Sequence, residues 1–422
     1  MTDNNANWKK ARIKDVSTPY TGNSIKDEHK DLYIDNINAI PYISTKDIND
    51  KFQTIDFDNG LFIKNSDKSF RRAPKNSTLL CIEGGNAGKK IAFNDRTVCF
   101  VNKLCCFHSK TENNKFLYYF LMSPSFTEEF KSRITGLIGG VSVSALRNIH
   151  IRLPAPDEQE KIANFLDEKC TEIDKLSEDI QKQIDILNDY KKSVITRAVT
   201  KGLNPNVKKK DSGQLHIGDI PEEWEIVRVK DVFKMQSGFT PDSKRTDYYD
   251  DVNGFNWVTI ADINKKSDLP ETTKSKISKK YIEAFHPRMA KAGSLLYSFK
   301  LSIGQVAFVK KDTYTNEAII SFSCKDTRNL RFLKYSSSLI EYNANTNIYG
   351  SKILNQQLIG NAHITLPPID EQDHIADYLD DFTAKMSDII DEKNNQLEKI
   401  DLYKKSIIYE YVTGKKRVKG AL

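Results

Sequence analysis

The sequence predicts an α+β fold in which two globular mixed α/β domains are joined by two long antiparallel coiled-coil helices, with pseudo-two-fold symmetry. The first observation behind this prediction is an internal repeat. The segment 153–159, LPAPDEQ, returns 213 residues later as 366–372, LPPIDEQ, and Trp8 with its following residues returns around Trp224. This period is far too long for a solenoid. The chain therefore contains two copies of a globular unit, each with an attached segment.

The second observation is a heptad pattern after the first globular part. Apolar residues fall seven apart in a seam of Leu166, Ile173, Ile180, Leu187 and Val194. Beside them, three or four positions away, stand Ile162, Leu176, Ile184 and Tyr190. Such a seam predicts one long coiled-coil helix over residues 157–201. Asp157 is the expected N-cap with Glu160 at the capping-box position, and Gly202 supplies a C-terminal stop.

The second copy of this helix begins at Asp370. Its seam consists of Leu379, Met386, Ile400 and Ile407. Lys393 occupies the position that Ile180 has in the first copy, so this helix is expected to be the weaker of the two. Two helices that each follow a globular domain are able to pair antiparallel, which would place the domains at opposite ends of a rod.

The third observation is that charge repeats with the sequence. The net charge is +7 for residues 1–152 and again for residues 224–365, and −3 for each helical segment. We therefore expect a first globular domain at 1–152, a first helix at 153–205, a linker at 206–223, a second globular domain at 224–365 and a second helix at 366–422. Basic domains suit phosphate backbones, although an ordinary soluble surface also explains this charge on either domain alone.

Inside the globular parts, short β-prone runs lie between Gly, Asn and Asp turns. Strands are expected at 78–82, 98–101, 294–297 and 307–309. Helices are expected at 115–121 and 330–342.

Composition limits the class of protein further. No run of about 18 apolar residues occurs, so no membrane span is expected. The first residues lack a basic region followed by an apolar stretch, so we expect no secretion. The six cysteines form no CxxC pattern and no zinc spacing with the seven histidines, which favours free thiols in a reducing cytoplasm.

Signatures of catalysis are missing from the sequence. An Asn-Pro-Pro-Tyr tetrapeptide of amino-methyltransferases is absent, and the only Pro-Pro precedes a predicted helix. The segment 84–89, GGNAGK, resembles a phosphate loop but has the wrong spacing and no Ser or Thr after Lys89, so a tight turn is the better interpretation. The histidines form no triad or metal pattern. We therefore expect no catalytic residues, no cofactor and no metal.

The repeated segments resemble a known family. Leu-Pro-x-x-x-Glu-Gln, then Ile-Ala-x-x-Leu-Asp, then a heptad helix with Tyr-Lys-Lys-Ser, is similar to the conserved region of type I restriction-modification specificity (S) subunits. The joining stretch around Asp211-Ser212-Gly213 and Trp224 also resembles that family. The resemblance covers nearly the whole chain and occurs twice.

This resemblance implies a non-catalytic subunit with two target-recognition domains, each reading one half of a split, asymmetric DNA sequence. It further implies that the helices act as a spacer and bind two modification (adenine methyltransferase) subunits, with ATP-dependent restriction subunits as further partners. Two alternatives stay open: a coiled-coil scaffold that does not bind specific DNA, and a methyltransferase or nuclease with unrecognised motifs.

Because recognition domains vary within such a family, no base-contacting residue is carried over from the resemblance. Loop residues with Arg, Lys, Asn, Gln, Ser or Thr are the chemical types that bind base edges and phosphates. The candidates in the first domain are Ser44, Thr45, Lys46, Lys64, Arg71, Arg72, Lys89 and Lys90. Those in the second are Thr259, Lys265, Lys274, Lys276, Lys279, Lys280, Lys300 and Gln305.

Overall fold

A computed structural model describes residues 8–137, 139–263, 269, 271–300, 302–326, 328–347 and 350–418. It consists of two compact units, and each long helix contributes to both. The first unit is Met1–Gln183 with Lys393–Leu422, and the second is Ile184–Glu392. No helix in the described part of the chain is long and apolar enough to cross a membrane.

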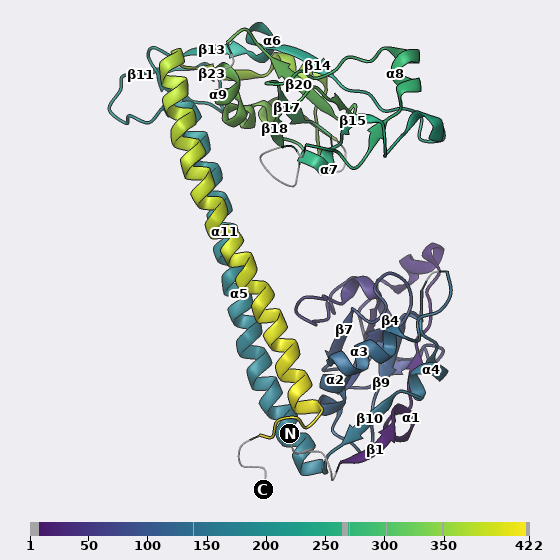
Figure 1. Cartoon of the computed structure of the whole chain (residues 1–422). Coiled ribbons are helices and arrows are strands. Elements are labelled where there is room, and N and C mark those ends of the chain that lie inside the picture. Colours follow the sequence, from purple (N-terminus) through teal and green to yellow (C-terminus); the bar gives the residue numbers. More distant parts are fainter. Residues whose placement is uncertain are drawn as a thin grey trace. The chain divides into compact units, whose positions relative to one another are not determined.

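The first unit contains two four-stranded sheets and a two-stranded ribbon (Figure 1). One sheet is antiparallel with strand order β2-β9-β6-β7, and the other has order β4-β3-β8-β5, with β3 and β8 parallel. The ribbon pairs β1 with β10. The strands are β1 (Lys9–Arg12), β2 (Tyr20–Thr21), β3 (Ala39–Ile43), β4 (Phe62–Lys64), β5 (Arg72–Ala73), β6 (Ser77–Cys81), β7 (Ile91–Asn94), β8 (Val98–Phe100), β9 (Leu104–Phe107) and β10 (His150–Leu153).

Helix α2 (Asn114–Met122) joins the first domain to the long helices. The side chain of Asn113 caps it by accepting hydrogen bonds from the amides of Lys115 and Phe116, both at 2.9 Å. Phe116 lies in one buried cluster with Leu166 and Ile407 of the long helices. The other helices of this domain are α1 (Ile13–Val16), η1 (Asp27–Tyr33), η2 (Thr45–Asp47), α3 (Pro124–Lys131) and α4 (Val143–Arg147).

The second unit repeats this plan. Its four-stranded sheet has order β14-β20-β17-β18, its β15 and β19 are parallel neighbours, and β13 pairs with β23 as β1 pairs with β10. The main strands are β13 (Glu225–Arg228), β14 (Lys234–Ser237), β15 (Phe255–Val258), β16 (Lys276–Ile277), β17 (Leu295–Ser298), β18 (Val306–Phe308), β19 (Tyr314–Thr315), β20 (Ile319–Ser323) and β23 (His363–Leu366). Two short ribbons complete the unit. One pairs β11 (Lys209–Asp211) with β12 (Asp219–Pro221), and the other pairs β21 (Asn345–Thr346) with β22 (Lys352–Ile353). The helices are α6 (Val229–Val232), η3 (Thr246–Tyr248), α7 (Ile260–Ile263), α8 (Lys279–Phe285), α9 (Arg328–Ser336), η4 (Ser337–Asn343) and α10 (Gln356–Asn361).

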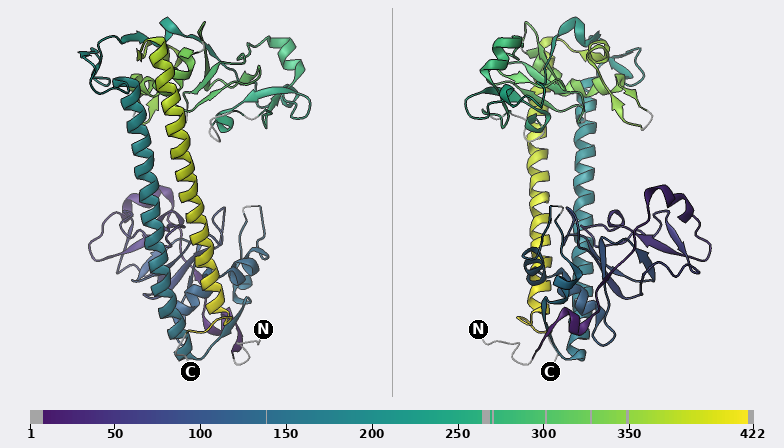
Figure 2. Two further views of the ribbon diagram at one scale, coloured as in Figure 1. Left: turned by 60° about the vertical axis from the view of Figure 1, so that its left-hand side comes forward. Right: turned by 90° about the vertical axis from the view of Figure 1, so that its right-hand side faces the viewer.

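Within each unit the long helices α5 (Pro156–Lys201) and α11 (Ile369–Val412) lie side by side (Figure 2). In the first unit Phe165 stacks against Tyr411 at 4.4 Å, while Asp174 binds Lys404. Residue numbers therefore rise along one helix as they fall along the other, so the pairing is antiparallel. In the second unit Tyr190 contacts Phe382 at a ring distance of 5.8 Å.

The burial of the helix residues shows that each long helix buries only a narrow stripe of side chains. Of the predicted seam, Leu166, Ile173, Ile180, Leu379 and Ile407 are buried, and Leu187, Val194, Met386 and Ile400 are half-buried. Two residues expected beside the seam are instead exposed, Leu176 at 51% and Tyr190 at 54%. Two paired helices bury one stripe each, and a wider apolar face is left in solvent.

The start of α5 differs from the expected one. Asp157 was predicted as the N-cap with Glu160 completing a capping box, but the helix already includes Pro156. Proline suits the first helical position because its fixed φ is helical and it has no amide to satisfy. At the other end, Gly202 has a φ of +73° and its amide donates to the carbonyl of Ala198 at 3.1 Å, as a helix stop requires. The stretch expected as a linker contains the β11–β12 hairpin.

Candidate nucleic-acid interface

Ser44 and Thr259 occupy equivalent places at the end of a strand. The amide and hydroxyl of Ser44 both donate to Asp47, at 2.8 and 2.7 Å, and those of Thr259 both donate to Asp262 at 2.8 Å. Each hydroxyl is thus used to start a short helical turn. The repeat of these residues in the sequence has a local structural cause, and direct reading of bases by their hydroxyls would require these bonds to break.

Lys46 and Lys90 line a hollow of about 420 Å³ in the first domain, and Lys90 also contacts Thr45. The ammonium of Lys90 donates to the carbonyl of Thr45 at 2.8 Å, while Lys46 is exposed. Asp47 and Asp56 line the same hollow, so its charge is mixed. Lys46 is the cation of this group with its side chain in solvent.

Lys64, Arg71 and Arg72 form a second group at the strands β4 and β5. Lys64 lies 3.7 Å from Asp35. The guanidinium of Arg71 is exposed and donates to the carbonyl of Thr21 at 3.1 Å. Arg72 is half-buried and donates to the carbonyl of Asn65 at 2.7 Å, which makes it a structural arginine.

The glycine-rich segment containing Lys89 is a tight turn. The amides of Ala87 and Gly88 donate to the carbonyls of Gly84 and Cys81 at 2.9 and 2.8 Å. The ammonium of Lys89 donates to the carbonyl of Gly85 at 3.0 Å. A phosphate cradle needs such amides free, so the segment is not a nucleotide loop.

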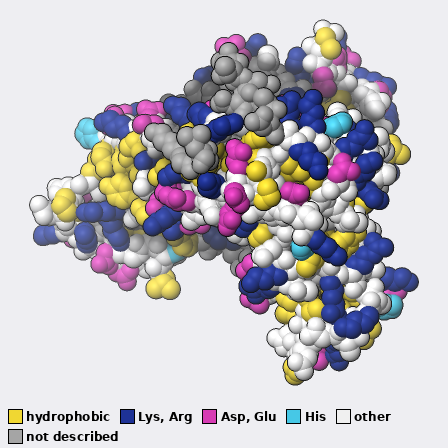
Figure 3. All heavy atoms as spheres, turned by 90° about the horizontal axis from the view of Figure 1, so that it is seen from below, with side chains coloured by type: hydrophobic (Ala, Val, Ile, Leu, Met, Phe, Trp, Pro, Cys, Tyr) yellow, Lys and Arg dark blue, Asp and Glu magenta, His cyan; other side chains and the backbone are white. Residues whose placement is uncertain are grey.

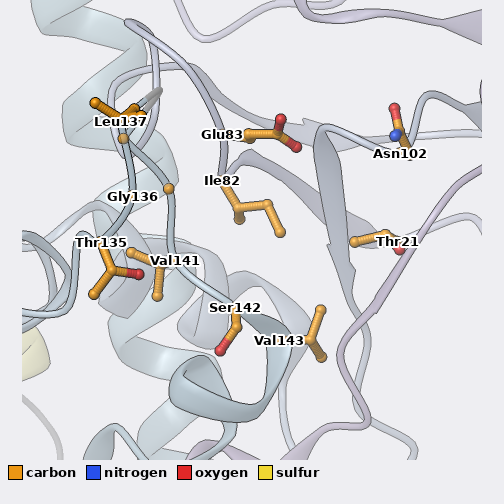
Figure 4. Close-up of a pocket in the computed structure, with 12 residues that line it drawn as sticks. Thr21, Ile82, Glu83, Asn102, Thr135, Gly136, Leu137, Val141, Ser142 and Val143 are labelled. Atoms are coloured by element: carbon orange, nitrogen blue, oxygen red, sulfur yellow. The ribbon is translucent and has the colours of Figure 1, made fainter.

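A hollow of about 560 Å³ opens in the first domain beside Thr21 (Figure 4). The carbonyl of Thr21 is the one that accepts from Arg71. Figure 4 shows Glu83, Asn102, Thr135 and Ser142 around it, over an apolar floor that includes Ile82, Val141 and Val143. Its wall is a loop held by reciprocal bonds between Thr135 and Gly140 at 2.9 and 3.0 Å.

Carboxylate, amide and hydroxyl groups are the ones that pair with base edges. The sequence analysis missed these residues because they come from three separate segments of the chain, at 82–83, 102 and 135–143. Only a search that admitted acidic side chains would have included Glu83.

In the second domain the cations gather at β16 and α8. Lys274 is exposed, Lys276 donates to the carbonyl of Val252 at 3.0 Å, and Lys279 lies 3.5 Å from Glu283. Lys280 binds Asp247 at 2.7 Å.

Arg245, which the sequence analysis did not select, binds the same carboxylate with two nitrogens, at 2.9 and 2.8 Å. The hydrogen bonds from Arg245 and Lys280 hold the pKa of Asp247 well below its usual range.

Lys300 and Gln305 share the hairpin between β17 and β18. Lys300 lies 3.9 Å from Glu317, and the side chain of Gln305 is exposed. Lys265 lies outside the described residues. The candidates therefore form several groups, and on the face shown in Figure 3 Lys and Arg side chains are spread over the surface among other types. Among the described residues, no group of His, Cys, Asp and Glu has a geometry that could hold a metal ion.

Two exposed apolar positions of the long helices recur in both units. In the first unit Leu176 is 51% exposed and Tyr403 58% exposed, close to the Asp174–Lys404 contact. Their equivalents 213 residues away are Ile389, 38% exposed, and Tyr190, 54% exposed. We call Leu176 with Tyr403 the first helix patch, and Ile389 with Tyr190 the second helix patch. Since single exposed apolar residues are common, the informative fact is that the same two positions recur in both units.

Each of the two mixed α/β domains is followed by one of the two long helices. Comparison with known proteins assigns this repeated fold to a family. Residues 5–186 and 221–399 match the family model described as "Type I restriction modification DNA specificity domain". The chain therefore belongs to this family. It is a specificity protein, and not a catalytic subunit.

Individual relatives support the same assignment. The type I restriction enzyme MjaVIII specificity subunit of Methanocaldococcus jannaschii is 27% identical over 405 residues, covering 90% of this chain and 87% of that protein. The putative MjaX specificity subunit of the same organism is 28% identical over 66% of this chain and 62% of its own length. A solved chain from work on complex assembly and conformational transition of the type I R-M system covers 96% of this chain and 97% of its own, with a TM-score of 0.68 and 15% identity. That likeness confirms the predicted fold class.

Proposed function

We propose that this chain is the subunit that reads a bipartite, asymmetric DNA sequence, with one half-site for each domain, and that brings modification and restriction subunits to it. The observation that carries the proposal is the presence of two domains with equivalent four-stranded sheets, β2-β9-β6-β7 and β14-β20-β17-β18, and different surface groups. Where the first domain offers the hollow around Glu83 and Asn102, the second offers the cations of β16 and α8. Different surfaces on equivalent frameworks suit two different half-sites.

Most cations in these groups have internal carboxylate or carbonyl partners. DNA phosphates would compete for them, and release of condensed counterions would favour binding. The exposed Lys46 and Lys274 need the least rearrangement, and the exposed Arg71 would give up its hydrogen bond to the carbonyl of Thr21. We propose these three as the first contacts to test.

The test is to combine the chain with its modification subunits and map methylated adenines on genomic DNA. The proposal predicts a split motif with two unlike halves. Replacing residues 20–140 by the same region of another such protein should change one half only. A single continuous motif, or a change in both halves, would contradict it.

The helix patches fit the second part of the proposal. Because the same two apolar positions recur in each unit, a single kind of partner surface would fit twice, which suits two identical modification subunits. Changing Leu176 and Tyr403 to Gln should reduce the bound modification subunits from two per chain to one, as measured by native mass spectrometry. Lys405→Gln on the same helix is the matched control, since Lys405 is exposed and, two positions from Tyr403, faces another side of the helix. Retention of two subunits by the double variant would exclude this surface.

A further inference from the structure

The aspartate that ends the repeated Ile-Ala-x-x-Leu-Asp motif binds the globular domain in both units. In the first unit Asp167 accepts a hydrogen bond from the hydroxyl of Tyr119 at 2.6 Å and forms an ion pair with Lys115 at 3.0 Å. In the second, the equivalent Asp380 accepts from the hydroxyl of Tyr335 and from Lys334 at 2.7 Å. The motif thus reaches from the long helix to the domain.

The tyrosines stand on equivalent helices. Tyr119 lies on α2 and Tyr335 on α9, 216 residues apart, and both are buried. Burial, with the nearby Asp167 carboxylate, raises the pKa of Tyr119 far above its usual value, so this tyrosine stays a donor. Burial alone would raise the pKa of Asp380, but its bonds from Lys334 and Tyr335 hold it below the ordinary value. The hydroxyls of Tyr119 and Tyr335 therefore stay neutral donors at neutral pH, and Asp380 stays a charged acceptor.

The glutamine of the motif makes a second contact eight residues earlier. Gln159 is fully buried; its amide donates to the carbonyl of Pro154 at 3.0 Å and to Glu112 at 2.6 Å. Its oxygen accepts from the amide of Asn113, the cap of α2, at 3.0 Å. In the second unit Gln372 is 2% exposed and donates to the carbonyl of Pro367 at 2.8 Å.

In the first unit these two contacts hold α2 at two points, the N-cap Asn113 and Tyr119. Gln159 and Asp167 are eight residues apart, or about 12 Å along a helix. Asn113 and Tyr119 are six residues apart, or about 9 Å. Two fixed points define the direction of one helix against another, whereas a single fixed point leaves a pivot.

We infer that Asp167 and Asp380 are positioning residues, which set the angle between each recognition domain and the helix that carries it and thereby fix the spacer of the DNA target. This inference rests on the proposed function. For a domain of this size the reading surface lies on the order of 25 Å from the junction. A tilt of about 8° moves it by about 3.4 Å, the rise of one base pair.

The two junctions differ in strength. In the second unit the cations Arg328, Arg331 and Lys334 of α9 face a row of acids on the first turns of α11. Arg331 alone lies 3.8 Å from Asp373, 2.6 Å from Asp377 and 3.1 Å from Asp380. In the first unit Lys115 is the cation paired with Asp167. The first domain should therefore lose its fixed angle more readily when its aspartate is removed.

The experiment uses the full chain assembled with its modification subunits. Its substrates carry the native half-sites with the native spacer, or with a spacer one base pair shorter or longer. Asp167→Ala should reduce discrimination against the altered spacers about tenfold, because it removes a charged hydrogen bond. Asp380→Ala should reduce it by a smaller factor, because Arg331 keeps its pairs with Asp373 and Asp377. Asp167→Asn and Asp380→Asn, which keep an acceptor for the tyrosine, should restore part of it. Glu168→Ala and Asp381→Ala, the exposed acids next in sequence, should behave as the unchanged protein.

Loss of folding alone would lower methylation on all spacers equally and leave their ratio unchanged. Circular dichroism identifies variants that do not fold; for these, Tyr119→Phe and Tyr335→Phe take their place. Folded variants with an unchanged spacer ratio would overturn the inference. If the unchanged protein has no split target, it is the proposed function that fails.

Discussion

The ion pair between Lys404 and Asp174 is a contact whose removal should be measurable in the first unit alone. The ammonium of Lys404 donates to both oxygens of Asp174, at 2.7 and 2.8 Å, and to Gln53 of the first domain at 2.8 Å. The side chain of Lys404 is 10% exposed and that of Asp174 31% exposed. Lysine is rarely this buried unless it is paired.

The size of the effect depends on which partner remains. Removing one partner of a fully buried pair costs about 3–5 kcal/mol, because the other charge is left uncompensated. Lys404→Met leaves Asp174 with partial hydration, so we expect about 2 kcal/mol. Asp174→Asn leaves the more buried ammonium, so we expect about 3 kcal/mol. Replacing both by Met and Leu should come within about 1 kcal/mol of the unchanged protein.

Two compact units do not unfold in one step, so the assay is hydrogen exchange read by mass spectrometry, peptide by peptide. A loss of about 2 kcal/mol corresponds to an opening constant raised about 30-fold in peptides of the first unit. Peptides of the second unit serve as the internal reference. The control is Lys405→Met, since Lys405 is 57% exposed and its pair with Asp401 should contribute little. Equal effects of Lys404→Met and Lys405→Met, or a double variant as unstable as the sum of its singles, would refute the reasoning.

Further outcomes are expected from the same structure. DNA affinity should fall steeply between about 50 and 200 mM salt as phosphate contacts are lost. An affinity that does not change with salt in a binding titration would contradict phosphate binding by the two basic domains. A fragment ending near Asn206 should dimerise, because Asp174 of one copy would contact Lys191 of the other, which is the equivalent of Lys404. Analytical ultracentrifugation that shows only monomer, or no effect of Lys191→Ala on dimerisation, would reject this. A fragment of the second copy should dimerise less, since Ser387 replaces the aspartate. The pKa of Asp380 is lowered in the folded chain, so its stabilisation is present above the ordinary aspartate value of about 3.9 and is lost as pH falls through the lowered one. Acid titration followed by exchange at α9 should show loosening below about pH 4 in the unchanged protein and not in Asp380→Asn.

The sequence predicted the features that depend on local pattern. The long helices follow from the seven-residue spacing, and the expected strand at 78–82 corresponds to β6 (Ser77–Cys81). The roles of Ser44 and Thr259 were also available from the sequence, since each stands three residues before an aspartate, a spacing typical of a cap. They were selected as DNA contacts because their residue type suits both roles.

Features that depend on distant parts of the chain could not be predicted. Lys404 is polar and its partner Asp174 lies 230 residues away, so no pattern indicated its burial. Leu176 looked like a flanking core residue, but its burial depends on how many helices pack together, and two leave it exposed. The hollow around Glu83 is assembled from four segments whose proximity only the fold reveals.

The contacts of Asp167 with Tyr119 and Lys115 have a consequence for how such proteins acquire new specificities. They occupy α2 and the first turns of α5, away from the hollow around Glu83 in the same domain. A recognition domain transferred from a relative then needs only a tyrosine and a cation at the positions of Tyr119 and Lys115 to be held at the native angle. Its loops are free to evolve without disturbing the assembly. A transferred domain that lacks the tyrosine should fold and bind its own half-site. It should nevertheless fail to bind that half-site at the native spacing from the half-site of the second domain.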